Sequence, residues 1–201
     1  LDFGNDYFKT MEQIKNLIQA SITVKEAVLQ NNELLQTIET VVDVIVQAFQ
    51  KGKRVYFCGN GGSAADAQHL AAEFSGRFYL DRKALPAEAL HCNTSYLTAV
   101  ANDYSFDAVY ARLIEGIGAE GDILIGLSTS GNSGNIVKAF EAAKTKGVIT
   151  IGFTGLSGGM LKKDSHYLIN VPSTDTPRIQ ETHITIGHII CQLVEAQYFK
   201  K

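Results

Sequence analysis

A histidine and a glutamate stand four residues apart, at His69 and Glu73, in a segment rich in residues that favour a helix. At that spacing both side chains share one helical face. Three glycines between Gly59 and Gly62 precede the segment and allow a ligand to approach the backbone closely, and Ser63 stands at the expected N-cap. The free N–H groups of a helix N-terminus favour phosphate or carboxylate. The pattern predicts a bound anion, with acid/base or metal chemistry one or two helical turns away.

Each of these features also has an ordinary explanation. A glycine-rich turn between a strand and a helix can serve tight packing alone. A histidine and a glutamate at this spacing are more often a solvated ion pair. A second segment of the same kind downstream favours the functional interpretation.

That second segment is the loop Ser128–Ser133, which follows an apolar run and precedes another expected helix. Its hydroxyl groups can donate to phosphate oxygens, and Gly131 lets the backbone curl around them. Clusters of such residues are also ordinary loops. Because no basic cluster accompanies the loop, it suits a single phosphate group better than a polyanion. The hydroxyl-bearing residues are Ser128, Thr129, Ser130 and Ser133.

A dinucleotide fold is the main competitor, because the residues from Gly59 to Ala64 fit the pattern GxGxxA. Such a fold needs an acidic residue that closes the second strand, about 20 residues on, to bind the ribose. The expected second strand ends at residues 90–93 without a carboxylate. The sequence therefore disfavours a nicotinamide cofactor.

Composition narrows the class of protein. The chain has 201 residues, of which 45% are hydrophobic and 19% charged, and this suits one globular α/β domain. With 18 basic and 21 acidic residues and no dense Lys/Arg run, nucleic acid is not favoured as a partner. Three widely spaced cysteines predict neither a disulfide framework nor a zinc knuckle and favour the cytosol. No apolar run approaches the roughly 20 residues that span a bilayer.

From residue 53 onward, expected strands and helices alternate. The strands are short apolar runs, as in parallel sheets that are covered on both faces. We therefore predict a doubly wound, five-stranded parallel α/β sheet whose ligands gather at the carboxyl ends of the strands. The expected strands are 55–58, 87–91, 123–127, 148–153 and 167–171, and the expected helices are 63–75, 95–101, 106–116, 133–146 and 177–199.

Two further helices are expected before residue 52, joined by a turn at Asn31 and Asn32. Their apolar stripes need a cover, either from the body of the domain or from another subunit, and we favour subunit association. We divide the chain into a helical pair at residues 1–52, which serves oligomerisation, and a phosphate-binding α/β region at residues 53–201.

Four motifs give the chain a close resemblance to the phosphoheptose isomerases of the sugar isomerase (SIS) domain family. They read CGNGGSAADAQHLAAEFSGRF, ANDYSF, GLSTSGNSGNIVKA and PRIQETHITIGHIICQLVE. The resemblance runs over nearly the whole chain. It implies an SIS fold and the interconversion of sedoheptulose 7-phosphate and D-glycero-D-manno-heptose 7-phosphate. That reaction provides the heptose for lipopolysaccharide and related bacterial surface glycans.

The resemblance also implies roles for individual residues. Glu73 would be a catalytic acid/base with His188 as its partner, and one zinc ion per subunit would be held by His69, Glu73, Gln180 and His188. The family forms homotetramers with active sites at subunit boundaries. Substrate contacts would come from Asn60, Gly61, Gly62, Ser63, Glu73, Asn102, Asp103 and Gln180, with Ser128, Thr129, Ser130 and Ser133 holding the phosphate.

This chemistry suits the residue types. Moving a carbonyl between C1 and C2 requires a proton to leave one carbon and return to its neighbour through an enediol(ate). A carboxylate such as Glu73 can abstract that proton, and an imidazole can shuttle protons near neutral pH. Zinc would polarise the two adjacent oxygens.

Helix geometry alone does not predict the shared metal group. Gln180 and His188 are eight residues apart, which is a rise of about 12 Å and a rotation of roughly 80°. His183, three residues after Gln180, is the choice that spacing favours, whereas the resemblance favours His188.

Two other functions stay open. One is a non-catalytic SIS protein, such as the relatives that bind the replication initiator, although Glu73, Gln180 and His188 favour an enzyme. The other is an isomerase of a different sugar phosphate, because a phosphate-binding loop says little about the length of the carbon chain.

Overall fold

A parallel sheet forms the centre of the fold. The computed structural model describes the backbone of residues 3–200 and the side chains of residues 10–200. The five strands are all parallel and lie in the order β2-β1-β3-β4-β5, which confirms the predicted fold class. Their bounds are Val55–Gly59 (β1), Ala87–Ala89 (β2), Ile123–Leu127 (β3), Ile149–Thr154 (β4) and Tyr167–Asn170 (β5).

The helices follow the predicted order with a few corrections. The expected helix 106–116 is a 3-10 turn followed by a separate α-helix, and the expected strand 87–91 ends at Ala89. Among the helices of residues 3–200, none meets the length and hydropathy of a transmembrane segment. The helices are α1 (Phe3–Leu29), α2 (Asn32–Gln50), α3 (Gly62–Ser75), α4 (Thr94–Asp103), η1 (Phe106–Ala108), α5 (Val109–Ile117), α6 (Gly134–Thr145), η2 (Gly159–Lys163) and α7 (Thr176–Tyr198).

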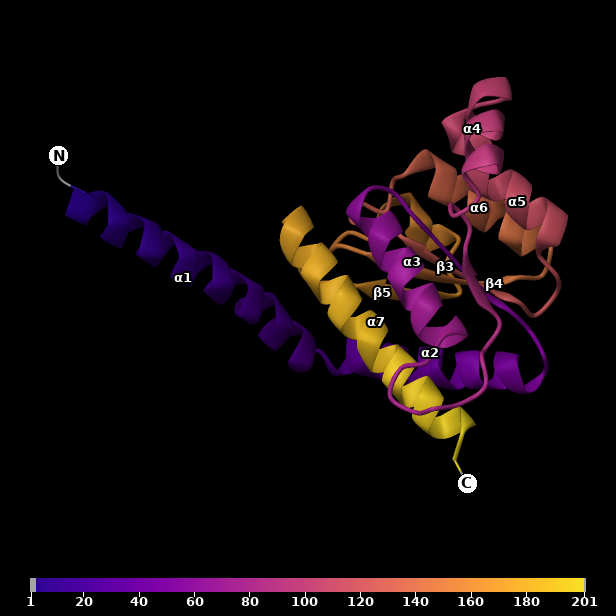
Figure 1. The fold of residues 1–201 in the computed structure, drawn as a ribbon, viewed down its shortest axis with the longest axis horizontal. Coiled ribbons are helices and arrows are strands. Elements are labelled where there is room, and N and C mark those ends of the chain that lie inside the picture. Colours follow the sequence, from indigo (N-terminus) through magenta and orange to yellow (C-terminus); the bar gives the residue numbers. More distant parts are fainter. Residues whose placement is uncertain (1–2, 201) are drawn as a thin grey trace.

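Alternate strand residues build two cores, one on each face of the sheet. Val55 and Phe57 of β1 join the apolar residues of α2, α3 and α7, whereas Tyr56 and Cys58 join those of α4, α5 and α6. Figure 1 shows α3 and α7 on one side of the sheet and α5 and α6 on the other. The helices that carry His69, Glu73 and His188 therefore belong to the same layer.

The two N-terminal helices differ in how they are covered. Asn31 caps α2 by accepting a hydrogen bond from the Leu34 N–H, and the apolar face of α2 is buried against α7 and β5. The expectation that a partner subunit covers this stripe is wrong for α2, because the domain itself covers it. Helix α1 instead extends away from the body of the protein (Figure 1). It leaves a stripe exposed that consists of Met11, Ile14, Leu17, Ile18, Ile22 and Leu29.

The topology places both predicted anion loops side by side. β1 pairs with β3, with Gly59 opposite Leu127. From β1 the chain moves outward to β2 and then returns across β1 to β3, so the order reverses between these two strands. Ligands of doubly wound sheets bind at such a reversal, beyond the carboxyl ends of the strands.

A glycine sets the distance between α3 and α7. A Cβ atom on Gly187 would lie 2.6 Å from both Cδ atoms of Leu70, closer than real side chains approach. Leu70 is itself buried, and the space beside it is an apolar cavity of about 10 Å³ that it lines together with Gly187. Gly187 thus permits a close approach of the two helices directly beside His188.

His183, also on α7, is a structural residue of the core. Its imidazole is fully buried, and Nε2 lies 3.1 Å from the Thr154 carbonyl oxygen of β4 and donates to it. Burial lowers the pKa of His183 to about 4, although the hydrogen bond to Thr154 opposes that shift.

We expect Gly187→Ala to lower the free energy of unfolding by about 1–3 kcal/mol, because the added methyl overpacks the α3–α7 contact. Urea denaturation measures the change. The matched control is Gly116→Ala on α5, where an added Cβ meets no heavy atom within 4 Å and alanine favours the helix. Equal stability of Gly187→Ala and the wild type would contradict the close contact.

Stability should fall as the pH drops from about 6.5 to about 4. In that window the unfolded chain binds a proton at residue 183 that the folded chain does not, which gives a slope of up to about 1.4 kcal/mol per pH unit. Urea denaturation of the wild type and of His183→Gln between pH 4 and pH 8 measures the difference in slope. Parallel pH profiles for the two proteins would show that His183 is not a buried neutral imidazole.

Candidate functional site

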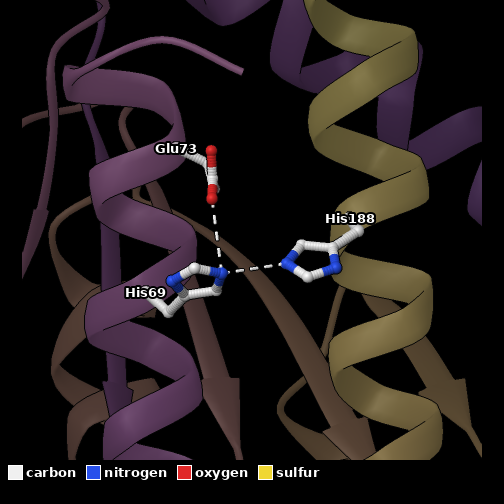
Figure 2. A group of neighbouring side chains, drawn as sticks. All are labelled: His69, Glu73 and His188. Atoms are coloured by element: carbon white, nitrogen blue, oxygen red, sulfur yellow. Dashed lines mark hydrogen bonds and ion pairs between the residues drawn. The ribbon is translucent and has the colours of Figure 1, made fainter. Parts of the chain in front are cut away.

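Three side chains from two helices form one group. His69 and Glu73 lie on α3, and His188 faces them from α7 (Figure 2). The Nε2 atoms of the two histidines are 3.0 Å apart, and His69 Nε2 is 3.3 Å from Glu73 Oε1. The structure therefore brings His188, rather than His183, to the histidine and glutamate of α3.

The group lies at the edge of the domain. The side chain of His69 is 52% exposed and that of Glu73 20% exposed, so a ligand can reach them from solvent. The partly buried ring of Phe78 lies 5.8 Å from that of His188, measured between centroids. The group is thus accessible to solvent, and the Phe78 ring packs against one of its members.

Asp66 is a neighbour that the sequence reasoning missed. It is half-buried on α3, three residues before His69 and seven before Glu73, so all three share one helical face. Burial raises the pKa of Asp66, while the nearby His69 and His188 partly oppose that shift. The helical spacing of three and seven residues was the signal that could have identified it.

The donor set fits a divalent metal. One ligand atom from each of His69, Glu73 and His188 lies within 4.8 Å of the others. Two nitrogens on one tetrahedral zinc ion, each at about 2.0–2.1 Å, would stand roughly 3.3 Å apart, close to the 3.0 Å between the two imidazoles. Two histidines and one glutamate are also the protein ligands of a type of catalytic zinc site that keeps one position open.

Gln180 lies apart from this group. Its amide packs against Gly62 in the first turn of α3, where a Cβ on Gly62 would lie 2.9 Å from both amide heteroatoms. His188 is eight residues further along α7, a rise of about 12 Å. Within one chain, Gln180 therefore stands beside the glycine loop and not beside the three other residues of the implied zinc set.

The first loop differs from the prediction in detail. The N-cap of α3 is Gly61, with φ of 53°, and not Ser63, which is buried inside the first turn. The side chain of Asn60 forms a reciprocal pair with Asn135 of α6, with N···O distances of 2.9 and 2.8 Å. This amide pair joins the glycine loop to the helix that follows the second loop.

The second loop is held by its own hydroxyl groups. Ser128 Oγ and Ser133 Oγ are 2.9 Å apart, and Ser130 Oγ accepts a hydrogen bond from the Asn132 N–H. Gly131 has φ of 68°, and a Cβ there would lie 2.2 Å from the Gly158 carbonyl oxygen. The predicted curl of the backbone at Gly131 is thus present, and Ser128 and Ser133 brace the loop.

A cavity of about 250 Å³ opens beside this loop. It lies between the loops that follow β3, β4 and β5 and the first turn of α7. The described residues that line it are all uncharged, so its polar groups are hydroxyls and amides. They are Thr129, Ser130, Asn132, Gly155, Leu156, Ser157, Ser173, Thr174, Thr176 and Ile179.

Asn102 and Asp103 stand elsewhere in the chain. Both are exposed at the end of α4, and the Asn102 amide donates to Asp103 Oδ1 at 2.9 Å. Helix α4 packs on η1 and α5, in the layer that covers the opposite face of the sheet from α3 and α7. One chain alone does not bring these two residues to the histidine–glutamate group.

The amino-acid sequence of the chain is similar to those of known proteins. Residues 16–155 match the SIS domain family. A phosphoheptose isomerase from Aneurinibacillus thermoaerophilus is 53% identical over 196 residues, which cover 98% of this chain and 96% of the relative. One from Clostridium acetobutylicum is 53% identical over 190 residues, covering 92% and 97%.

Solved structures agree with these relatives. The phosphoheptose isomerase of Neisseria gonorrhoeae is 37% identical with a TM-score of 0.87, covering 93% of this chain and 99% of that one. The enzyme from Francisella tularensis is 34% identical, also with a TM-score of 0.87, covering 92% and 97%. With the sheet, the two loops and the histidine–glutamate group in place, these similarities show that the chain belongs to the phosphoheptose isomerases of the SIS domain family.

Proposed function

We propose that this enzyme interconverts sedoheptulose 7-phosphate and D-glycero-D-manno-heptose 7-phosphate. The observation that carries the proposal is the group of His69, Glu73 and His188, in a chain about half identical to proteins named phosphoheptose isomerase. The product would supply heptose for lipopolysaccharide and related surface glycans, and the reaction would take place in the cytoplasm.

Glu73 and His188 divide the proton transfers between them. The Glu73 carboxylate, through the oxygen that does not hold the metal, takes the proton from the carbon next to the carbonyl and returns it to the neighbouring carbon, so the carbonyl moves between C1 and C2. The imidazole of His188, through its ring nitrogen that does not hold the metal, takes a proton from one of the two sugar oxygens and gives one to the other, a task that suits histidine near neutral pH. Placed general acids and bases of this kind contribute about 10²–10⁴-fold each to a rate.

Zinc fits the donor set. His69, Glu73 and His188 would hold it, and when bound it would supply Lewis-acid chemistry that polarises oxygen atoms of the sugar. Any contact of Gln180 with this group would have to come from a partner subunit, because within one chain its amide packs against Gly62. Beside Gly62, Gln180 can instead contact the substrate of its own chain.

The phosphate is held at the uncharged cavity. Thr129 and Ser130 line it and donate to phosphate oxygens, whereas Ser128 and Ser133 hold the loop in shape. Backbone N–H groups of the loops and of the first turn of α7 supplement them. Binding the remote phosphate contributes energy that positions the reacting carbons.

A partner subunit completes the active site in this proposal. Ile179 lines the cavity, and His188 lies nine residues further along α7, a rise of about 13.5 Å. That separation is long for one monosaccharide phosphate, which supports an active site shared between chains of a homotetramer. The same arrangement would let Asn102 and Asp103 of one chain, together with Asn60, Gly61, Gly62 and Ser63 of the glycine loop, contact the sugar.

The exposed stripe of α1 supplies a contact surface for such a tetramer. Its apolar residues recur at helical spacing, and α1 extends away from the rest of the chain (Figure 1). Arg178 of α7 fixes the orientation of α1 by donating to the Leu17 carbonyl oxygen at 2.7 Å. Within the helical pair of residues 1–52 we therefore assign α1 to oligomerisation, and we assign residues 53–201 to sugar-phosphate binding.

Conversion of ketose phosphates with five, six and seven carbons, with metal-free and zinc-loaded protein, tests the activity. We expect turnover of the seven-carbon substrate and a loss of about 10²–10⁴-fold in Glu73→Gln, because the amide cannot abstract the proton. The matched control is Glu39→Gln, which makes the same change on the exposed face of α2 and should leave kcat unchanged.

Two results would contradict this assignment. Absence of seven-carbon conversion with and without zinc would reject the substrate, and faster conversion of a shorter sugar phosphate would favour that isomerase. Full activity in Glu73→Gln would reject the acid/base role. A fold that is intact without any conversion by the wild type would favour a non-catalytic binding protein.

The tetramer can be tested on α1. We expect Ile18→Glu to yield a smaller particle in analytical ultracentrifugation, because a carboxylate on the apolar stripe would be buried without a partner. The control is Gln19→Glu, which adds the same charge at the next, polar position of the helix. A monomeric wild type, or an unchanged mass for Ile18→Glu, would reject α1 as an assembly surface.

A further inference from the structure

Arg82 and Glu195 form a buried ion pair just beyond the end of α3. Their side chains are only 3% and 2% exposed, less than in any other ion pair of the described residues. Arg82 Nε lies 2.8 Å from Glu195 Oε2. A buried ion pair adds little net stability compared with apolar residues, so its presence calls for another explanation.

Arg82 holds the last turn of α3. Its Nη2 donates to the carbonyl oxygen of Glu73 itself at 2.8 Å, and its Nη1 donates to the carbonyl oxygen of Phe74 at 2.7 Å. Nη1 also lies 3.1 Å from the carbonyl oxygens of Gly76 and Lys83. The last carbonyls of a helix have no partner within the helix, so one guanidinium satisfies and fixes several of them.

Glu195 connects this turn to α7. It lies seven residues after His188, two helical turns further along the same face. Besides Arg82, it accepts the backbone N–H groups of Phe78, Tyr79 and Leu80 at 3.1, 2.8 and 2.9 Å. Burial alone would raise the pKa of Glu195, but these donors hold it below its ordinary value, so the carboxylate stays charged.

The segment that Glu195 binds, residues 78–80, also contacts the histidine–glutamate group. Phe78, whose N–H Glu195 accepts, places its ring against that of His188. The pair is therefore linked to Glu73 through a backbone carbonyl and to His188 through Phe78 and α7. These links, together with the Gly187–Leu70 contact directly beside His188, join α3 and α7 around the site.

We infer that Arg82 and Glu195 are positioning residues that set the distance of His69 and Glu73 on α3 from His188 on α7. Neither Arg82 nor Glu195 contacts the two imidazoles or the Glu73 carboxylate. The pair therefore acts on these groups through the helices α3 and α7 that carry them. The inference rests on the proposed function, in which those three residues hold zinc and perform the proton transfers.

Two variants test the pair without removing its bulk. Arg82→Lys keeps the charge but loses the planar fork that reaches several carbonyls, and Glu195→Gln keeps the shape but presents an amide N–H₂ to two of the four donors. The control is Lys144→Gln, which breaks an ion pair with Asp164 (N···O 3.0 Å) on the opposite face of the sheet. Thermal unfolding of each protein sets an assay temperature at which all are folded.

The readouts are the zinc dissociation constant, by competition with a chromophoric chelator, and the visible spectrum of the cobalt-substituted protein. We expect Arg82→Lys and Glu195→Gln to bind zinc about 10- to 100-fold more weakly and to shift the cobalt bands, as when groups that orient metal ligands are removed. Lys144→Gln should match the wild type in both. Unchanged affinity and spectrum in the two variants would overturn the inference.

Two further outcomes separate this inference from the proposed function. If the wild type binds no zinc, the metal assignment fails, and a crystal structure of Arg82→Lys decides the inference. There a His69–His188 separation that has grown beyond 3.0 Å supports it, and an unchanged separation overturns it. If both variants fail to fold at any temperature, the pair is a general requirement of the fold and the inference is likewise overturned.

Discussion

The contact between α3 and α7 is the constraint on which the site depends. His69 and His188 are 119 residues apart in sequence, yet their Nε2 atoms are 3.0 Å apart, because two long helices pack closely on one face of the sheet. Gly187 permits that approach, since any side chain there would overlap Leu70. The buried Arg82–Glu195 pair joins the same helices further along. The packing of α3 against α7 thus brings the side chains of His69 and Glu73 to that of His188.

The sheet positions the two loops that are expected to bind the substrate. Its strand order reverses between β1 and β3. The glycine loop (residues 59–62) and the hydroxyl-bearing loop Ser128–Ser133 therefore begin side by side. The amide pair of Asn60 and Asn135 ties them together. Because the described lining of the neighbouring cavity is uncharged, recognition of a phosphate there would rely on oriented hydroxyls and N–H groups, which define a position more sharply than a diffuse basic surface.

The sequence predicts the sheet well, because its strands are apolar runs bounded by glycine and hydroxyl residues. Strand 123–127 matches to the residue, whereas the edge strand β2 is shorter than expected, and Gly61 rather than Ser63 caps α3. Local spacing identifies His69 with Glu73 but favours His183 over His188. His183 instead points into the core, where it pairs with Thr154. Which face of α7 meets α3 is decided by tertiary packing, and helical spacing alone cannot reveal it.

A single metal ion held by His69, Glu73 and His188 would make these residues one reaction centre. Anomalous X-ray scattering at the zinc absorption edge, from crystals grown with zinc, would locate that ion. We expect one strong peak per chain within bonding distance of Nε2 of His69, Nε2 of His188 and a carboxylate oxygen of Glu73. A peak bound by other residues, or no peak between these two helices, would contradict this metal site.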